Sequence, residues 1–290
     1  MSQVAPDASG NGPRDCGLFF LDVIGQYAPD RISVRWCDTP RATNDKLEAL
    51  IEQTWTGEME RARQTERRLF DGRLCRLVHC EASEQRLELT VGAVSYREFL
   101  GTNLRQAHVR YLYGGDVLAN PLGVSAALAT NDGFLIFGRR SERVSHHAGR
   151  IHPLGGMVEP PASSRETPDP LSDMLNELRE ETNLPDSCVR ECVCLGLVRD
   201  KHIVQPELVF DIAVDADAAT IRQSFGEAVD AGEHSELLAV RSHPSVVVNF
   251  IEQRFGELTP VALATMLLYG LRHWGSGWFA AARGYLRSVI

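Results

Sequence analysis

Three glutamates in residues 176–184 are the side chains best suited to chemistry. They are Glu177, Glu180 and Glu181, and spacings of three and four residues bring side chains together on a helix. Neighbouring carboxylates repel one another unless a cation lies among them. A hard divalent ion with oxygen ligands is the natural occupant. The stretch therefore predicts a Mg²⁺ site, with Mn²⁺ as the other candidate, in which these glutamates are metal ligands.

The helix that must carry these glutamates has recognisable ends. Asp169 supplies a side-chain cap, Pro170 suits the first helical position, and Asn183 suits the left-handed residue that closes a helix. The apolar residues in between fall on one arc at about 100° per residue: Leu171, Met174, Leu175 and Leu178. The pattern predicts an amphipathic helix with its carboxylates on the arc beside the buried one.

A glycine pair lies upstream of this acidic helix. Gly155 and Gly156 let backbone groups approach an ion or a phosphate closely, and Glu159 follows three residues later. An acidic helix face alone is most often only solvated, whereas the glycine pair favours a metal site. The carbonyl group of Gly155 is therefore a further expected metal ligand.

The composition describes an ordinary globular protein, since a chain of 290 residues can bury a substantial core. The net charge of −9 argues against a nucleic-acid partner, so an anionic substrate needs metal ions or a few placed arginines. The seven cysteines lack paired spacing, which favours reduced thiols in the cytoplasm. We see no signal peptide or membrane span and expect no membrane partner. The oligomeric state is left open.

Apolar periodicity and turn signals divide the chain into two folded parts. Residues 16–116 combine short strand-like runs with a charged helical stretch over residues 44–70, which indicates a smaller α+β domain. Residues 117–275 contain a strand hairpin, the acidic helix, further strands and a final apolar helix. This order predicts an α/β sandwich with a mixed sheet. We expect residues 1–15 to be disordered and residues 276–290 to form a tail.

Two groups outside the acidic helix suit a nucleotide. Tyr96 and Phe99 follow a predicted strand among polar residues, so they either hold a flat heterocycle or pack one domain on the other. Arg140 ends the hairpin that leads into the glycine pair. Its guanidinium suits bidentate contact with a diphosphate, and the alternative is a solvated strand end.

The glycine pair and the acidic helix resemble the box of the Nudix hydrolases, a glycine-led loop followed by R-E-x-x-E-E-x-G on a helix. The box arginine is Asn176 here, and its last glycine is Asn183. An insert also places Ala162 where the box has a glutamate. That glutamate and arginine normally form an ion pair, so the loss of both leaves no unpaired charge. The three acids of the box are kept.

Longer blocks resemble the animal Nudix enzymes that cleave UDP-glucose and UDP-galactose, and they lie between about residues 46 and 270. The most specific block is Ser95-Tyr-Arg-Glu-Phe-Leu-Gly-Thr-Asn103. The others are residues 70–72, 120–130, 139–141, 181–185, 232–235 and 258–260. The resemblance implies an N-terminal domain that joins a Nudix domain in binding substrate. It also implies Mg²⁺-dependent hydrolysis of the nucleotide sugar to UMP and the sugar 1-phosphate.

Carried over by position, the resemblance makes Glu177 and Glu181 metal ligands, with Glu180 beside them, and it implies that all three are catalytic residues. It also implies seven positions that meet the substrate: Phe70, Tyr96, Arg140, Ser145, His152, Met157 and Glu159. Met157 stands where the family has a histidine, His152 where it has an acidic residue, and Val261 where it has a hydroxyl group. These departures bear on the choice of sugar more than on the chemistry.

The reaction implied by the resemblance needs a proton acceptor for the attacking water, and either Glu177 or Glu180 fits that role. Two alternative functions stay open. One is hydrolysis of another nucleoside diphosphate derivative such as ADP-ribose. The other is a non-catalytic nucleotide-sugar sensor, although a sensor is expected to lose the acids that this chain keeps.

Overall fold

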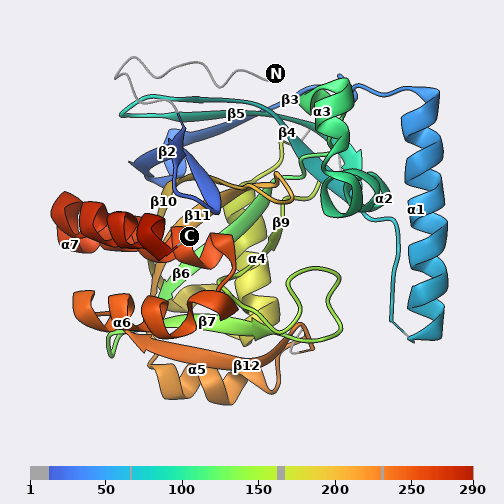
Figure 1. The fold of residues 1–290 in the computed structure, drawn as a ribbon. Coiled ribbons are helices and arrows are strands. Elements are labelled where there is room, and N and C mark those ends of the chain that lie inside the picture. The colour runs from blue at the N-terminus through green and yellow to red at the C-terminus, as the bar shows by residue number, and fades with distance from the viewer. Residues whose placement is uncertain (1–12, 66, 162–166, 230–231, 290) are drawn as a thin grey trace.

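The computed structural model describes residues 13–65, 67–161, 167–229 and 232–289 (Figure 1). Of residues 1–15, which we expected to be disordered, residues 1–12 lie outside the described residues, as does the insert position Ala162. Arg14 and Asp15 form a short strand instead, because they pair with Leu21 and Phe20. The helices in chain order are α1 (Asp45–Gln64), α2 (Tyr96–Phe99), α3 (Val109–Tyr113), α4 (Pro170–Thr182), α5 (Ala218–Phe225), α6 (Pro244–Arg254) and α7 (Pro260–Val289). Within the described residues, none of them is long and apolar enough to cross a membrane.

The strands form one large and one small sheet. They are β1 (Arg14–Asp15), β2 (Phe19–Tyr27), β3 (Ile32–Trp36), β4 (Arg73–Ala82), β5 (Leu87–Ser95), β6 (Gly123–Ala129), β7 (Phe134–Arg140), β8 (Ile151–His152), β9 (Leu154–Met157), β10 (Val189–Asp200), β11 (Pro206–Val214) and β12 (His234–Arg241). The large sheet has the order β1-β2-β10-β11-β6-β7-β12, with β8 beside β7 and β9 beside β6. Strands β6 and β11 run parallel and the other pairs antiparallel, so the predicted mixed sheet is confirmed.

Helices cover both faces of the large sheet (Figure 1). Successive side chains of a strand point to opposite faces, and on β6 Val124 and Ala126 enter one core while Ala127 enters the other. The first core contains the buried faces of α4 and α5, and the second contains those of α6 and α7. The chain is therefore an α/β protein, as the pattern of elements predicts.

The small sheet has the order β3-β5-β4 and is separate from the large one, but backbone hydrogen bonds connect the two. The amide of Cys75 on β4 donates to the Val158 carbonyl at 2.9 Å, and the Leu122 amide donates to the Cys75 carbonyl at 2.8 Å. The buried side chains of β4 and β5 also belong to the core that contains α4. Strand β4 thus holds the small sheet against the segments that flank β6 and β9.

The first strands lie elsewhere than in the N-terminal domain that we expected over residues 16–116. Strand β2 pairs antiparallel with β10, with Val23 opposite Leu197, and extends the large sheet. The reason is apolar burial, because Phe19 and Leu21 are 0% and 1% exposed and pack in the core beneath α7. Two strands that are neighbours in sequence, β2 and β3, therefore belong to different sheets.

The C-terminal residues also differ from the expected tail. Residues 276–289 continue α7 beyond a break at Gly275, whose φ of 85° is a left-handed value that glycine adopts readily. After this break, Phe279, Ala282 and Leu286 recur at helical spacing and are buried against the large sheet. A glycine- and tryptophan-containing sequence thus forms a bent, packed helix.

Candidate active site

Helix α4 carries the three glutamates and has the predicted ends. The Asp169 carboxylate accepts from the amides of Leu171 and Ser172, and Asn183 closes the helix with a φ of 58°. The buried face of the helix includes Glu181, which is only 1% exposed. The predicted helix and its caps are confirmed, and Glu181 is buried whereas Glu177 and Glu180 are partly exposed.

The glycine pair lets β9 approach both β6 and α4. A Cβ atom at Gly155 would lie 2.1 Å from the Val124 carbonyl oxygen, inside the ladder that β9 forms with β6. A Cβ atom at Gly156 would lie 1.7 Å from Oε1 of Glu177. Any larger residue would displace the strand or the carboxylate. The two glycines therefore fix how closely the acidic helix meets the sheet.

Glu181 is held from two sides. Its Oε2 accepts from the Gly155 amide at 2.9 Å, and its Oε1 lies 2.7 Å from Nε2 of His234. Burial, together with the positive charge of Arg140, lowers the pKa of His234 to about 4, so this imidazole is neutral at pH 7. Its Nε2–H then donates to Glu181, while Nδ1 has no hydrogen-bond partner among the described residues. The sequence patterns gave no signal for this pairing, although His234 falls in one of the matching blocks.

An acidic pocket of about 180 Å³ lies beside α4. Four carboxylates line it, together with Met157 and Asn176: Glu159, Asp173, Glu177 and Glu180. Burial raises the pKa of Asp173 to about 6, with the charge of Glu159 adding to the effect, and its buried Oδ2 has no hydrogen-bond partner among the described residues. Four carboxylates side by side are oxygen donors of the kind that a hard divalent cation prefers.

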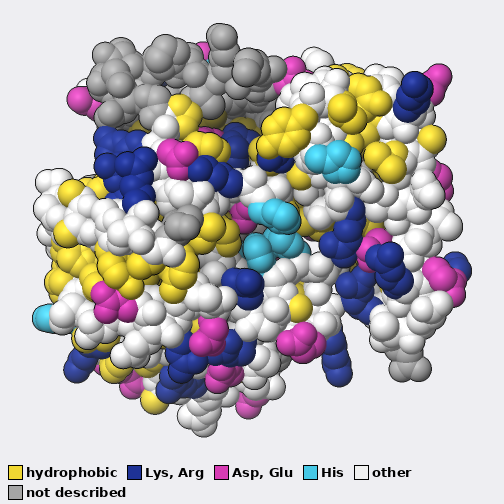
Figure 2. Space-filling model, viewed as in Figure 1, with side chains coloured by type: hydrophobic (Ala, Val, Ile, Leu, Met, Phe, Trp, Pro, Cys, Tyr) yellow, Lys and Arg dark blue, Asp and Glu magenta, His cyan; other side chains and the backbone are white. Residues whose placement is uncertain are grey.

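A larger cleft of about 1070 Å³ joins the two parts of the chain. It is lined by all seven residues expected at the substrate: Phe70, Tyr96, Arg140, Ser145, His152, Met157 and Glu159. Gly155 and Glu177 line it as well, whereas Glu180 lines the acidic pocket and Glu181 lines neither space. Figure 2 shows histidine side chains gathered near the centre of this face, with Lys or Arg side chains around them.

The N-terminal wall of the cleft presents two aromatic rings. Tyr96 opens α2, where Ser95 and Glu98 form a capping box, and its ring meets Phe99 edge-on at 6.1 Å between centroids. Phe70 comes from the turn before β4 and is 64% exposed, with the Arg68 guanidinium 5.3 Å from its ring centroid. Rings from two separate segments therefore line the same space.

Arg140 lies at the end of β7, in the middle of the cleft's polar groups. Its Nε donates to the His146 carbonyl at 3.1 Å, and its terminal nitrogens make no hydrogen bond within the described residues. Burial and then the Arg140 charge place the pKa of His152 well below its ordinary value. The arginine thus supplies a positive charge near neutral imidazoles, with donors available to an anion.

The floor of the cleft contains a carboxyl that the sequence patterns did not assign. Glu207 opens β11 and is buried, and burial raises its pKa to about 7. Its Oε1 lies 3.9 Å from Nε2 of His152, whose Nδ1 is 2.9 Å from the Thr259 hydroxyl. The only sequence signal was its place at a strand start on the accessible side. Burial therefore disfavours the charged form of both the Glu207 carboxyl and the His152 imidazole.

Comparisons with known proteins give the class. No family model matches the chain. A mouse protein named uridine diphosphate glucose pyrophosphatase NUDT22 is 35% identical, and the match covers 89% of this chain and 91% of the mouse protein. The human protein of the same name is 32% identical, over 63% of this chain and 68% of its own length. A solved structure, DR0079 from Deinococcus radiodurans, is 20% identical with a TM-score of 0.37, over 51% of this chain and 83% of that one.

The identity and coverage of these relatives decide the family. The chain belongs to the Nudix hydrolases, as the glycine pair and the acidic helix predict. It is an enzyme of the pyrophosphatase kind.

Proposed function

We propose that the chain hydrolyses the diphosphate of a UDP-sugar, UDP-glucose or UDP-galactose, to UMP and the sugar 1-phosphate. The observation that carries this proposal is the single cleft that joins Phe70 and Tyr96 to Gly155 and Glu177. The base, the diphosphate and the sugar of such a substrate need one continuous space, and each part needs a different kind of side chain around it. The names of the mouse and human relatives support the same substrate class.

Arginine side chains in the cleft support an anionic substrate despite the net charge of −9, and six acidic residues share the lining with them. Five arginines line the space: Arg67, Arg68, Arg73, Arg140 and Arg143. Guanidinium groups suit phosphate oxygens because their donors form a planar fork. The few placed arginines that an acidic chain needs for such a substrate are therefore present.

The divalent ion in this proposal is Mg²⁺, which Mn²⁺ can replace, held by Glu177 and Glu180 of the acidic pocket. Glu181 and the Gly155 carbonyl, which lie outside the lining of that pocket, complete the proposed ligand set. Bound there, the ion would neutralise charge on the diphosphate and acidify a water. Glu177 lines both the acidic pocket and the cleft, so its carboxylate lies where the two spaces meet. Glu181 orients the Gly155 amide through its hydrogen bond. The proton of the attacking water passes to Glu177 or Glu180.

The remaining residues bind and orient the substrate. Phe70 and Tyr96 contact the uracil ring, and Arg140 contacts the diphosphate with its free terminal nitrogens. Ser145, His152, Met157 and Glu159 complete the substrate contacts. The seven cysteines are all free thiols, which supports placing the enzyme in the reducing cytoplasm.

A panel of substrates tests the proposal. UDP-glucose, UDP-galactose, CDP-glucose, ADP-ribose and NADH are supplied with Mg²⁺, and the products are identified by chromatography. We expect UMP and sugar 1-phosphate from the two UDP-sugars at the highest kcat/KM. A higher kcat/KM with ADP-ribose or NADH than with the UDP-sugars would show that the proposed substrate class is wrong. Tight calorimetric binding of UDP-glucose without turnover would instead establish a sensor.

A further inference from the structure

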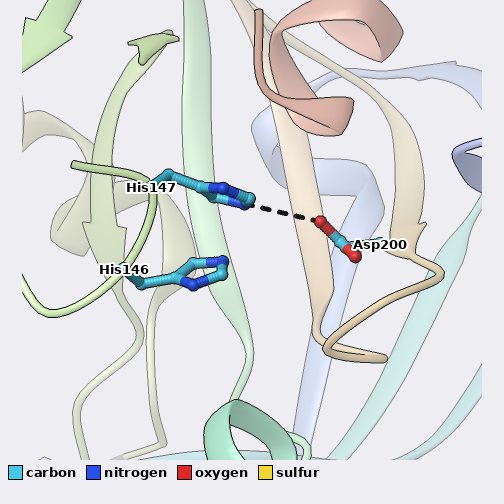
Figure 3. A group of neighbouring side chains, drawn as sticks. All are labelled: His146, His147 and Asp200. Atoms are coloured by element: carbon cyan, nitrogen blue, oxygen red, sulfur yellow. Dashed lines mark ion pairs between the residues drawn. The ribbon is translucent and has the colours of Figure 1, made fainter. Parts of the chain in front are cut away.

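Three potential metal ligands converge on the cleft in a group separate from the glutamates of α4. His146 and His147 lie in the loop between β7 and β8, and Asp200 ends β10 (Figure 3). One ligand atom from each lies within 4.8 Å of the others, and Nε2 of His147 is 3.5 Å from Oδ2 of Asp200. All three residues line the cleft.

The loop holds its histidines in a defined conformation. His147 has a φ of 55°, a left-handed value that is uncommon for a residue other than glycine. The Arg150 amide donates to the His147 carbonyl at 3.1 Å, and Arg140 donates to the His146 carbonyl at 3.1 Å. The Gly149 amide also donates to the Arg140 carbonyl at 2.9 Å. Backbone bonds to the end of β7 thus direct both rings towards Asp200.

Two atoms of this group are buried without hydrogen-bond partners among the described residues. They are Nε2 of His146 and Oδ2 of Asp200. The other oxygen of Asp200 accepts from the amides of His202 and Ile203, at 2.6 and 3.1 Å. One oxygen therefore fixes the carboxylate. The second oxygen has only the His147 imidazole near it, at 3.5 Å, and the His146 nitrogen makes no hydrogen bond to a described residue.

We propose that His146, His147 and Asp200 bind a divalent transition-metal ion of the zinc class. Two imidazoles with one carboxylate suit Zn²⁺, Co²⁺ or Ni²⁺, whereas the all-oxygen pocket beside α4 suits Mg²⁺. The 3.5 Å between His147 and Asp200 is close to the ~3.4 Å between ligands of a tetrahedral zinc ion. Binding draws His146 closer to the other two residues. Three protein ligands leave a position open to the cleft, where an oxygen of a phosphate or sugar binds.

This metal site goes beyond the proposed hydrolysis, and its test needs no nucleotide sugar. Zn²⁺ is titrated into the full chain by calorimetry, with Mg²⁺ in large excess to occupy the acidic pocket. The test variants are His147→Asn and Asp200→Asn. Asn tolerates the left-handed backbone at position 147 but is too short to replace the imidazole. Asn at position 200 still accepts from both amides and loses the anionic oxygen.

The matched control is His202→Ala, which removes an exposed imidazole two residues from Asp200 and keeps the turn. We expect one tight site in the wild type and the control, and an affinity loss of more than about 100-fold in both test variants, because even the partners of metal ligands are worth 10–100-fold. The melting temperature should rise with Zn²⁺ only in the wild type and the control. Co²⁺ should give an absorption spectrum of nitrogen and oxygen ligands, without sulfur.

Zn²⁺ binding that is equal in the wild type and both test variants would overturn the proposal and leave the three residues as an ion-paired loop anchor. A sulfur-ligand spectrum would overturn it too. If the variant at position 147 does not fold without metal, the variant at position 200 carries the comparison alone. Circular dichroism of each variant before titration decides which comparison is used.

Discussion

The two walls of the cleft differ in how firmly they hold their functional side chains. On the sheet side, Glu181 is 1% exposed and has hydrogen bonds to His234 and to the Gly155 amide. On the N-terminal side, Phe70 is 64% exposed and Tyr96 is only half-buried. Preorganised groups suit the transition state of a reaction, whereas exposed rings close on a ligand when it arrives. The contrast predicts that the sheet-side wall determines kcat and the N-terminal wall determines KM.

The largest expected effect comes from removing the charge of Glu181. In Glu181→Gln, the amide keeps both hydrogen bonds if the His234 proton moves to its unpaired Nδ1, so we expect the melting temperature to change little. We expect kcat for UDP-glucose to fall at least ~100-fold at saturating Mg²⁺, as when a preorganised electrostatic contact is lost. Glu252→Gln, at an exposed position of α6, is the control. Normal turnover in the position-181 variant would remove Glu181 from the catalytic set.

The next prediction tests the burial of the sheet-side wall. Burial raises the pKa of Glu207 from 4.5 to about 7, so the folded state binds this proton more tightly than the unfolded state. The contribution of Glu207 to the free energy of unfolding is therefore fully present below pH 4.5. It is lost as the pH rises through 7, and the loss is on the order of 3 kcal/mol. Between pH 4 and pH 8, the free energy of unfolding of Glu207→Gln should increase relative to that of the wild type by the same amount, as measured by urea unfolding. If the difference in free energy of unfolding between the two proteins does not change with pH, the Glu207 carboxyl is hydrated and the sheet-side wall is not dry.

Arg140→Lys probes the phosphate contact between the two walls. Lysine keeps the charge but loses the planar fork and the Nε bond to the His146 carbonyl. We expect kcat/KM for UDP-glucose to fall about ten-fold or more, in line with ~1.5–3 kcal/mol for hydrogen bonds to charged groups. Arg143→Lys, on the same loop and lining the same cleft, should change it little. Equal losses in both variants would show that the loss is not specific to the contact of Arg140.

The smallest expected effects belong to the exposed rings. Tyr96→Ala should raise KM for UDP-glucose roughly ten-fold with kcat nearly unchanged, because stacking contributes ~1–3 kcal/mol in both ground and transition states. Phe70→Ala should raise KM less and leave the melting temperature unchanged, since its ring is mostly exposed. KM for CDP-glucose should be measured in parallel. An unchanged KM with a lower melting temperature would mean that Tyr96 only packs the small sheet.

The features that could be predicted from the sequence are local ones. The ends of α4 depend on Asp169 and Asn183, whose side chains and backbone preferences act within one turn. The hairpin of β6 and β7 could be predicted for the same reason, because its turn residues also act locally. The place of β2 could not be predicted, because its alternation is equally suited to either sheet and its partner β10 lies far along the chain.

The candidate site shows the same division. The acids on α4 have helical spacing and could be found, whereas the hydrogen bond between Glu181 and His234 joins α4 to β12 and has no local signal. Asp200 meets His146 and His147 only because β10 and the β7–β8 loop end at the same cleft. The helix over residues 276–289 was a missed local signal, since Phe279, Ala282 and Leu286 are spaced for one helix face.

The position of β2 in the large sheet sets an order of events during synthesis. Strand β2 leaves the ribosome early, but β10 begins only at Val189, after most of the chain has been made. Contacts that span such a separation form slowly and expose unpaired strand edges meanwhile. Nascent chains that end before Val189 should therefore be cut by protease within residues 14–27, and chains that extend past β11 should be protected there. The N-terminal strands thus remain exposed until the sheet that they extend has formed.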